Sequence, residues 1–263
     1  MNVKFYKYQG TGNDFVIIDD REEQFPLTDT ALVARLCDRR FGIGADGLML
    51  LRNAPGYDFK MVYYNSDGGE SSMCGNGGRC LARFAEYLGI VKNKCSFIAI
   101  DGPHEAVIEP EVVRLKMQDV TEVEKGNNHY ILNTGSPHYV CTAKQLKELN
   151  IIEPAKAVRY NERFAAKGIN VNFIEQQEDG IFVRTYERGV EDETLSCGTG
   201  VTAVAIANAF ITNELSNGAH ETSVITPGGK LKVAFTYSTA NNSFTNIWLI
   251  GPATLVFSGD VNY

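Results

Sequence analysis

Hydrophobic and polar positions along the chain follow two periods, which predict strands interspersed with a few helices. Asp58–Tyr64 has the alternating character of a half-buried strand. Helical spacing of apolar residues predicts helices over Asp29–Arg39, Cys74–Leu88, Ala143–Leu149 and the almost wholly apolar Val201–Ile211. Further strands are expected over Met1–Tyr8, Phe15–Asp19, Ile131–Thr134, Tyr139–Thr142 and Ile181–Tyr186, and as short elements up to Val120 and Phe257.

The predicted elements occur twice in the same order. Each cycle runs from a strand through a polar loop into Cys-Gly-x-Gly and then a helix, at Cys74-Gly-Asn-Gly77 and at Cys197-Gly-Thr-Gly200. The two motifs are about half the chain length apart, and no low-complexity linker separates them. We infer two similar α+β domains related by an approximate two-fold, with equivalent loops meeting at a cleft.

A loop of small residues that leads into a helix exposes unpaired backbone N–H groups. These groups and the helix dipole favour an anion, and they give a cysteine at the same place thiolate character. A single Cys-Gly-x-Gly is read more readily as a small buried residue before a turn. Two copies at matching places in a repeat predict instead that two thiols grip one ligand.

Composition and charge limit the classes of ligand and partner. The 263 residues include 25 Lys and Arg against 32 Asp and Glu, a net charge of −7, which argues against nucleic acid or a membrane surface as partner. No apolar run approaches the length of a membrane span, and the first residues lack the pattern of a signal peptide. We therefore expect a cytoplasmic protein with reduced cysteines and a small-molecule ligand. The six cysteines form no C-x-x-C pair, so no metal site is predicted.

Two thiols facing one carboxylate suit the inversion of an α-carbon. One thiolate removes the α-proton from one face, and the opposite thiol returns a proton to the other. The site must stabilise a carbanion-like state with donors aimed at the carboxylate and by excluding water. No motif for a pyridoxal phosphate lysine was found, and a cysteine pair needs no cofactor.

The ordered motifs resemble those of the diaminopimelate epimerase family, and together they span nearly the whole chain. They are Gly10-Thr-Gly-Asn-Asp-Phe15, Gly42-Ile-Gly-Ala-Asp-Gly47, Tyr64-Asn-Ser-Asp-Gly68, Met73-Cys-Gly-Asn-Gly-Gly-Arg-Cys80, Gly135-Ser-Pro-His138, Ile169-Asn-Val171, Tyr186-Glu-Arg-Gly189 and Ser196-Cys-Gly-Thr-Gly200. The resemblance implies cofactor-independent epimerisation of L,L-2,6-diaminopimelate to the meso form, in lysine and peptidoglycan-precursor biosynthesis. It also implies a homodimer.

The fold that the resemblance implies is α+β, with two pseudo-two-fold-related domains, each a curved mixed β-sheet wrapped around a central helix. The C-terminal strand of that fold returns to the first domain. We therefore expect one domain of residues 1–120 plus 251–263, carrying Cys74, and a second of residues 121–250, carrying Cys197.

The resemblance also implies roles for individual residues. Cys74 and Cys197 would be the acid and base, with Cys74 facing the L,L α-proton. His138 and Glu187 would adjust the thiol pKa values, since an imidazolium favours a thiolate and a carboxylate disfavours one. The expected substrate-binding residues are Gly75, Asn76, Gly198 and Thr199 at the reacting carboxylate, Asn13, Asn65, Asn170 and Arg188 at the distal amino-acid end, and Glu187 at an ammonium group.

Two positions depart from the best-known form of the pattern, and they affect substrate detail more than the reaction type. Ser136 stands where many members have Asn, and Gly47 where some have Gln. Ser136 has a shorter reach than Asn, and Gly47 offers only backbone. Arg79, on the helix after Cys74, is expected to be solvated or structural.

Two other functions stay open at this point. A proline racemase-like enzyme would share the two cysteine motifs, but the asparagines, His138, Glu187 and Arg188 favour a substrate with a second amino-acid end. A non-enzymatic anion-binding protein on the same fold is the alternative from a different class, because a fold does not determine a function. The presence of both cysteines argues against it.

Overall fold

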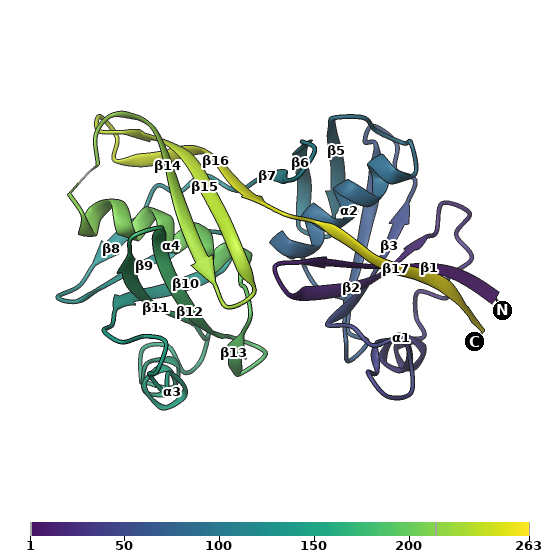
Figure 1. Cartoon of the computed structure of the whole chain (residues 1–263), viewed down its shortest axis with the longest axis horizontal. Coiled ribbons are helices and arrows are strands. Elements are labelled where there is room, and N and C mark those ends of the chain that lie inside the picture. Colours follow the sequence, from purple (N-terminus) through teal and green to yellow (C-terminus); the bar gives the residue numbers. More distant parts are fainter. Residues whose placement is uncertain (1, 214, 263) are drawn as a thin grey trace. The chain divides into compact units, whose positions relative to one another are not determined.

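The computed structural model describes residues 2–213 and 215–262, which divide into two compact units (Figure 1). Unit 1 comprises the described residues up to Leu115 together with those from Gly251 onward, and unit 2 comprises Lys116–Ile250. Each unit combines a mixed sheet with two helices. The predicted α+β fold with two similar domains is confirmed.

The sheet of unit 1 begins at the C-terminal strand. Strand β17 (Thr254–Asn262) pairs antiparallel with β1 (Asn2–Gly10), which pairs antiparallel with β2 (Asn13–Asp19). Strand β2 lies parallel to β3 (Gly47–Arg52), which is antiparallel to β4 (Phe59–Asn65). The sheet continues through β5 (Lys94–Ala99, parallel to β4), β6 (Gly102–Ile108) and β7 (Val113–Lys116).

Unit 2 repeats this pairing pattern, which supports the internal repeat read from the cysteine motifs. Strands β8 (Val123–Lys125), β9 (His129–Asn133) and β10 (Pro137–Thr142) are antiparallel neighbours, and β10 is parallel to β11 (Asn170–Gln177). Strand β11 is antiparallel to β12 (Gly180–Glu187), which carries the short β13 (Asp192–Thr194) and is parallel to β14 (Gly218–Thr226). Antiparallel β15 (Gly229–Ser238) and β16 (Ser243–Gly251) complete the sheet.

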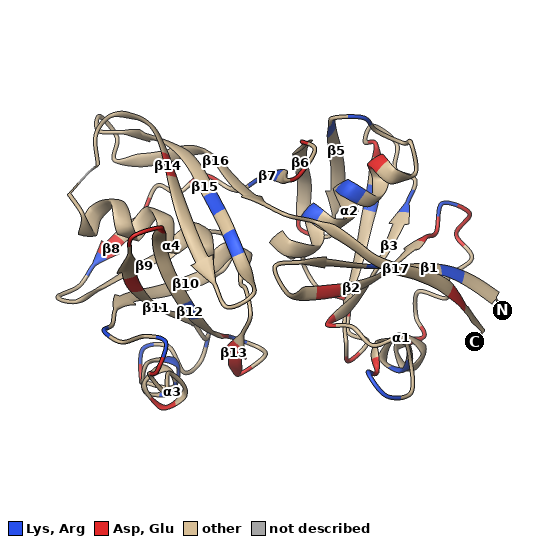
Figure 2. Ribbon diagram, in the orientation of Figure 1, with Lys and Arg blue, Asp and Glu red and all other residues tan. Residues whose placement is uncertain are grey.

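The helices that follow the two cysteines form the centres of their units. Helix α2 (Gly75–Tyr87) contacts β1, β2, β3 and β6, and α4 (Gly198–Ile211) contacts strands from β9 to β15. Helix α4 carries no charged residue, as Figure 2 shows, and it is buried on nearly all sides. A helix that is apolar all round is stable only when strands surround it.

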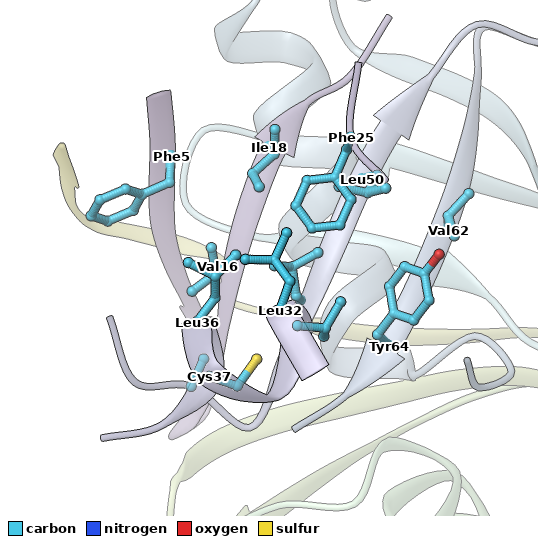
Figure 3. Packing of buried hydrophobic residues seen from close by; sticks show 13 residues of the cluster. Phe5, Val16, Ile18, Phe25, Leu32, Leu36, Cys37, Leu50, Val62 and Tyr64 are labelled. Atoms are coloured by element: carbon cyan, nitrogen blue, oxygen red, sulfur yellow. The ribbon is translucent and has the colours of Figure 1, made fainter. Parts of the chain in front are cut away.

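A smaller helix covers the other face of each sheet. In unit 1, α1 (Thr30–Cys37) packs on Val16 and Ile18 (Figure 3), whereas Phe15 lies beside Gly77 of α2. This is the alternation expected of a strand buried on both faces. In unit 2, α3 (Ile152–Arg159) packs with the cluster around Val171.

Three of the four predicted helices are present, and one prediction is wrong. Ala143–Leu149 forms turns instead of a helix: Gln145 has a φ of 52°, and its N–H donates to the carboxylate of Glu175 at 2.6 Å. The helix of this region is α3, which begins at Ile152 and was missed. Pro154 lies in the first turn of this helix, where proline is tolerated.

The turn after β4 provides a test of backbone packing in unit 1. Gly68 has a φ of +90°, and a Cβ at this position would lie 2.1 Å from the carbonyl oxygen of Thr30. We expect Gly68→Ala to lower the free energy of unfolding by about 3 kcal/mol, since neither backbone segment can yield. Gly89→Ala is the matched control: its φ is +72° and nothing lies within 4 Å of the added Cβ, so a loss of only about 1 kcal/mol is expected in urea unfolding. Equal losses in the two variants would contradict the packing argument.

Candidate active site

Cys74 and Cys197 occupy equivalent positions, each as the last extended residue before the central helix of its unit. Their φ and ψ angles are −95° and 132° for Cys74, and −115° and 112° for Cys197. The cysteine carbonyls accept the first helical hydrogen bonds, from Gly78 N at 2.7 Å and from Val201 N at 2.9 Å. Each sulfur therefore lies at a helix N-terminus, where the positive end of the dipole favours a thiolate.

The other four cysteines have a different character. Burial raises the pKa of Cys37, Cys80, Cys95 and Cys141 to about 12 in each case. Thiols held neutral in this way are poor nucleophiles and poor bases. The chemistry of the chain is thus concentrated at the two helix N-termini.

Asn13 lies next to Cys74 in unit 1. Its Oδ1 is 3.5 Å from Cys74 Sγ and 3.2 Å from Asn76 Nδ2, and its own Nδ2 donates to Asp46 Oδ2 at 2.7 Å. The structure thus brings three predicted residues together, with Asn13 beside Cys74, and the role of Asn13 at the distal amino-acid end stays a prediction. Asn65, at the end of β4, has an exposed side chain.

An ion-pair cluster holds the Asn13 loop. The Asp14 carboxylate lies 2.8 Å from Lys7 Nζ and accepts hydrogen bonds from the two Nη atoms of Arg39 at 2.9 and 2.7 Å. Arg39 also forms an ion pair with Asp46 at 2.8 Å. Burial alone would raise the pKa of Asp14, but the hydrogen bonds from Arg39 and Lys7 outweigh it and hold that pKa well below its usual range. The sequence motifs contained Asp14 and Asp46, yet nothing in their spacing revealed this support.

The tertiary structure explains glycine at position 47. Gly47 pairs with Asn65 across β3 and β4, and a Cβ on Gly47 would lie 2.6 Å from the Tyr64 carbonyl oxygen and from the Tyr63 ring. A longer side chain at this position would need the strand to move. Gly47 can therefore offer a ligand only its backbone groups.

The surroundings of Cys197 in unit 2 include a chain of hydrogen-bonding groups. Cys197 Sγ lies 3.5 Å from Thr199 Oγ1, which lies 2.9 Å from His138 Nε2. His138 is completely buried; burial, reinforced by the charge of Arg188, lowers its pKa to about 3. The imidazolium expected from the sequence is therefore corrected: the ring is neutral near pH 7 and acts through hydrogen bonds.

The neutrality of His138 gives a direct prediction. Its ring signals in an NMR pH titration are expected to stay constant between pH 5 and 8, because protonation would place an unpaired charge in the core of unit 2. Since the pKa of the folded state lies below that of the unfolded chain, this group opposes folding as the pH falls from about 6.5 towards 3. A titration midpoint near the ordinary value of about 6.5 would contradict the burial argument.

A second group of predicted residues meets at the β10–β11 end of unit 2. Asn170 Nδ2 donates to Ser136 Oγ at 2.9 Å and to Pro137 O at 3.0 Å, while its Oδ1 accepts from Arg188 N at 2.9 Å. Arg188 Nη2 also lies 3.3 Å from Ser136 Oγ. Ser136 is thus the shared acceptor of this group, and Glu187 alongside accepts from Thr194 at 2.9 Å.

Sequence reasoning missed Asn172, which contacts the predicted residue His138. Asn172 is completely buried, and its Nδ2 lies 3.1 Å from His138 Nδ1. The available signal was the polar pair at positions 170 and 172, which alternates with the apolar Val171 and Phe173, since residues two apart share a face. Among the described residues, no group of three or more His, Cys, Asp or Glu could hold a metal ion.

Sequence comparison decides the family. The family model described as diaminopimelate epimerase matches residues 5–123 and 130–256. The chain belongs to the diaminopimelate epimerase family. A diaminopimelate epimerase of Flavobacterium psychrophilum is 54% identical over 257 residues, covering 97% of this chain and 98% of that protein. One of Chlorobaculum tepidum is 39% identical over 262 residues, covering 96% and 98%.

Family membership confirms the resemblance read from the motifs. The chain is an isomerase of the epimerase class, and the predicted reaction, epimerisation of diaminopimelate in lysine biosynthesis, is confirmed with it. In the part of the chain that the structure covers, no helix is long and apolar enough to cross a membrane.

Solved structures confirm the fold at low sequence identity. A phenazine biosynthesis protein of the PhzF family from Bacillus anthracis is similar with a TM-score of 0.81 and 14% identity, covering all of both chains. A probable proline racemase from Agrobacterium radiobacter K84 has a TM-score of 0.69 and 16% identity over 99% of this chain and 93% of that one. At these identities the likeness concerns the fold alone.

Proposed function

We propose that the chain interconverts L,L-2,6-diaminopimelate and meso-diaminopimelate by moving one α-proton between Cys74 and Cys197, without a cofactor. The observation that carries this proposal is the duplicated thiol: each unit ends an extended segment with a cysteine at the N-terminus of its buried central helix. A two-base inversion uses one proton-transferring group on each face of the carbon, and the repeat supplies two thiols.

The proton balance is simple. One sulfur, as thiolate, takes the α-hydrogen as a proton, and the electrons of the broken C–H bond pass into the substrate carboxylate. The other sulfur, as thiol, gives its proton to the opposite face of the same carbon. Each turnover exchanges the protonation states of the pair, so Cys74 and Cys197 titrate as one coupled system. We assign Cys74 to the L,L α-proton.

The backbone after each cysteine is suited to the reacting carboxylate. N–H groups in the first turn of a helix have no intrahelical partner, and Gly75, Asn76, Gly198 and Thr199 supply four of them. Hydrogen bonds from these donors strengthen as negative charge builds on the carboxylate in the transition state. This is the stabilisation that replaces an electron-accepting cofactor.

The distal amino-acid end is assigned to the group around Ser136. Arg188 offers a guanidinium fork to a carboxylate, and Asn170 holds Arg188 N and Ser136 Oγ in one place. Glu187 and Asn65 are assigned to the distal end as well, with Glu187 at its ammonium group. A proline-type substrate has no such second end, so this group favours diaminopimelate over proline racemisation.

We also propose that the active form is a cytoplasmic homodimer. Two-fold dimers are the commonest protein assembly, which supports the dimer. Light scattering after size exclusion gives the mass of the assembly, and a mass near the 29.0 kDa of one chain would refute the dimer. Cell fractionation with an activity assay tests the location.

The deciding experiment is solvent proton exchange. The purified, reduced protein is incubated with L,L-diaminopimelate in D₂O without added cofactor, and the products are followed by NMR and chiral chromatography. Deuterium at one α-carbon together with the meso isomer is expected. If folded protein with titratable thiols produces neither, the proposal fails, and parallel incubations with proline and other amino acids test the racemase alternative. A protein that binds without exchange would be an anion-binding protein.

A further inference from the structure

Asn172 is a buried polar residue to which the proposed reaction assigns no role. It lies on β11 two residues after Asn170, and its side chain faces α4, since a Cβ added to Gly200 would lie 2.7 Å from Asn172 Oδ1. Burying an amide in an apolar unit is costly unless its hydrogen bonds are made. The partners of this amide therefore indicate what it is for.

Three hydrogen bonds fix the orientation of the Asn172 amide. Its Oδ1 accepts from Thr185 Oγ1 at 2.9 Å. Its Nδ2 donates to the Tyr139 carbonyl oxygen at 3.0 Å and to His138 Nδ1 at 3.1 Å. A flipped amide would set its oxygen against the Tyr139 carbonyl oxygen, so the nitrogen must face His138.

The orientation of the amide determines the tautomer of the neutral histidine. Because Nδ1 of His138 accepts a hydrogen bond from Asn172, the single ring proton resides on Nε2. In this tautomer the Nε2–H points to Thr199 Oγ1 at 2.9 Å, the shorter of its two contacts, since Asn170 Nδ2 lies 3.5 Å from the same nitrogen. The hydrogen of the Thr199 hydroxyl is then available to Cys197 Sγ, 3.5 Å from the oxygen.

The opposite tautomer would reverse the donor and acceptor roles in this series of hydrogen bonds. With the proton on Nδ1, the Nε2 lone pair would take the Thr199 hydroxyl hydrogen, and Cys197 would have to donate its own S–H to Thr199 Oγ1. That arrangement favours the thiol, whereas the Nε2–H tautomer lets the Thr199 hydroxyl donate to sulfur and favours the thiolate. The direction of these hydrogen bonds is thus set by Asn172, which is separated from the sulfur by the side chains of His138 and Thr199.

We propose that Asn172 is a positioning residue for proton transfer at Cys197, which holds His138 in the Nε2–H tautomer and so directs the Thr199 hydroxyl towards the sulfur. The inference rests on the proposed function of Cys197 as a base. The charge of Arg188 acts on His138, and Glu187, also in unit 2, accepts from Thr194. Both remain in a variant at position 172.

The test compares Asn172→Leu with Asn208→Leu. Leucine has the same branched skeleton of four side-chain heavy atoms as asparagine and removes the hydrogen bonds. Asn208 is likewise buried in unit 2 but accepts from Gln176 instead of contacting His138. Nitrogen-15 NMR reports which ring nitrogen of His138 carries the proton. Alkylation by iodoacetamide across a pH series, read by mass spectrometry of the separate cysteine peptides, reports the thiolate at Cys197 with Cys74 as internal reference.

Wild-type protein and Asn208→Leu are expected to show the proton on Nε2. Asn172→Leu should populate the Nδ1–H form, alkylate Cys197 about tenfold more slowly at pH 7 and lose about tenfold in kcat, while KM stays within about twofold. An unchanged tautomer with an unchanged Cys197 alkylation profile would overturn the proposal. If Asn172→Leu does not fold, Thr185→Val is used instead, because it removes the hydrogen bond to Asn172 Oδ1. It must then shift the His138 tautomer and the alkylation of Cys197 in the same direction. Neither readout needs turnover, so an inactive wild-type protein would refute the proposed function separately.

Discussion

Cys74→Ala and Cys197→Ala are each expected to lower the rate of epimerisation by about 10³-fold or more, with the fold intact. Each variant lacks one of the two groups that exchange the α-proton, and a positioned acid or base contributes about 10²–10⁴ in rate. The fold should survive because neither cysteine side chain makes a capping hydrogen bond to its helix. Turnover in the coupled D₂O assay and circular dichroism measure the two expectations.

Alanine variants at structural cysteines are the matched controls. Cys95 in unit 1 and Cys141 in unit 2 have thiols whose pKa is raised to about 12 by burial. Cys95→Ala and Cys141→Ala should therefore retain nearly full activity. A Cys74→Ala or Cys197→Ala protein that kept more than about a tenth of wild-type turnover would contradict the two-base mechanism.

Serine variants separate proton removal from inversion. With a substrate analogue that carries a good leaving group next to the α-carbon, loss of that group needs only one proton to be removed. Cys74→Ser or Cys197→Ser should therefore still eliminate from such an analogue, measured by release of the leaving group, while failing to epimerise diaminopimelate. Loss of both activities in both variants would indicate damage to the site as a whole.

Asp14→Asn is expected to lower the free energy of unfolding by about 3 kcal/mol, which removing one partner of a buried ion pair typically costs. Lys7, only 6% exposed, and Arg39 both pair with this carboxylate, so the variant leaves a buried ammonium group without its anion. Epimerisation should also fall, because the same cluster holds Asp46 against Asn13 beside Cys74. Urea unfolding and the D₂O assay provide the measurements.

The control and the pH dependence sharpen this prediction. Asp179→Asn breaks an exposed pair with Lys230 and should cost less than about 1 kcal/mol.

The folded-state pKa of Asp14 is depressed, so its contribution to the free energy of unfolding is complete above the unfolded pKa near 4. That contribution is lost as the pH falls through the folded-state pKa. Wild-type protein should therefore lose stability below about pH 4 more steeply than Asp14→Asn. Parallel curves would contradict the role of the cluster.

Local sequence signals predicted most of the helices and strands, and the one wrong helix has a cause outside the local sequence. Asp29 caps α1 by accepting from Leu32 N at 2.9 Å, as expected of an aspartate directly before apolar residues at helical spacing. The error at Ala143–Leu149 arose because buried Leu146 gives helical spacing while Glu175, far along the chain, binds the backbone N–H groups of Gln145 and Leu146. Such long-range partners leave no trace in a periodicity.

Arg79 shows the same limit at the site. One turn into α2, it was expected to be solvated or structural, and of these two alternatives the structure fits the second: it is completely buried and donates to the Gly75 carbonyl oxygen at 3.2 Å and to Asn76 Oδ1 at 3.1 Å. Burial lowers its pKa. The residue type indicated exposure, and only the packing of the helix between strands of unit 1 revealed a buried role.

The sequence by itself determined the family, the reaction, the repeated α+β units and the two cysteines. These follow from short motifs and from periodicities of two and about 3.6 residues, which depend on residues close together in the chain. Only the tertiary structure brought Asn172 against His138, buried the His138 ring, and joined Asp14, Arg39 and Asp46 in the cluster beside Asn13. Charge state and hydrogen-bond direction depend on burial and on partners from distant strands, and those exist only once the chain has folded.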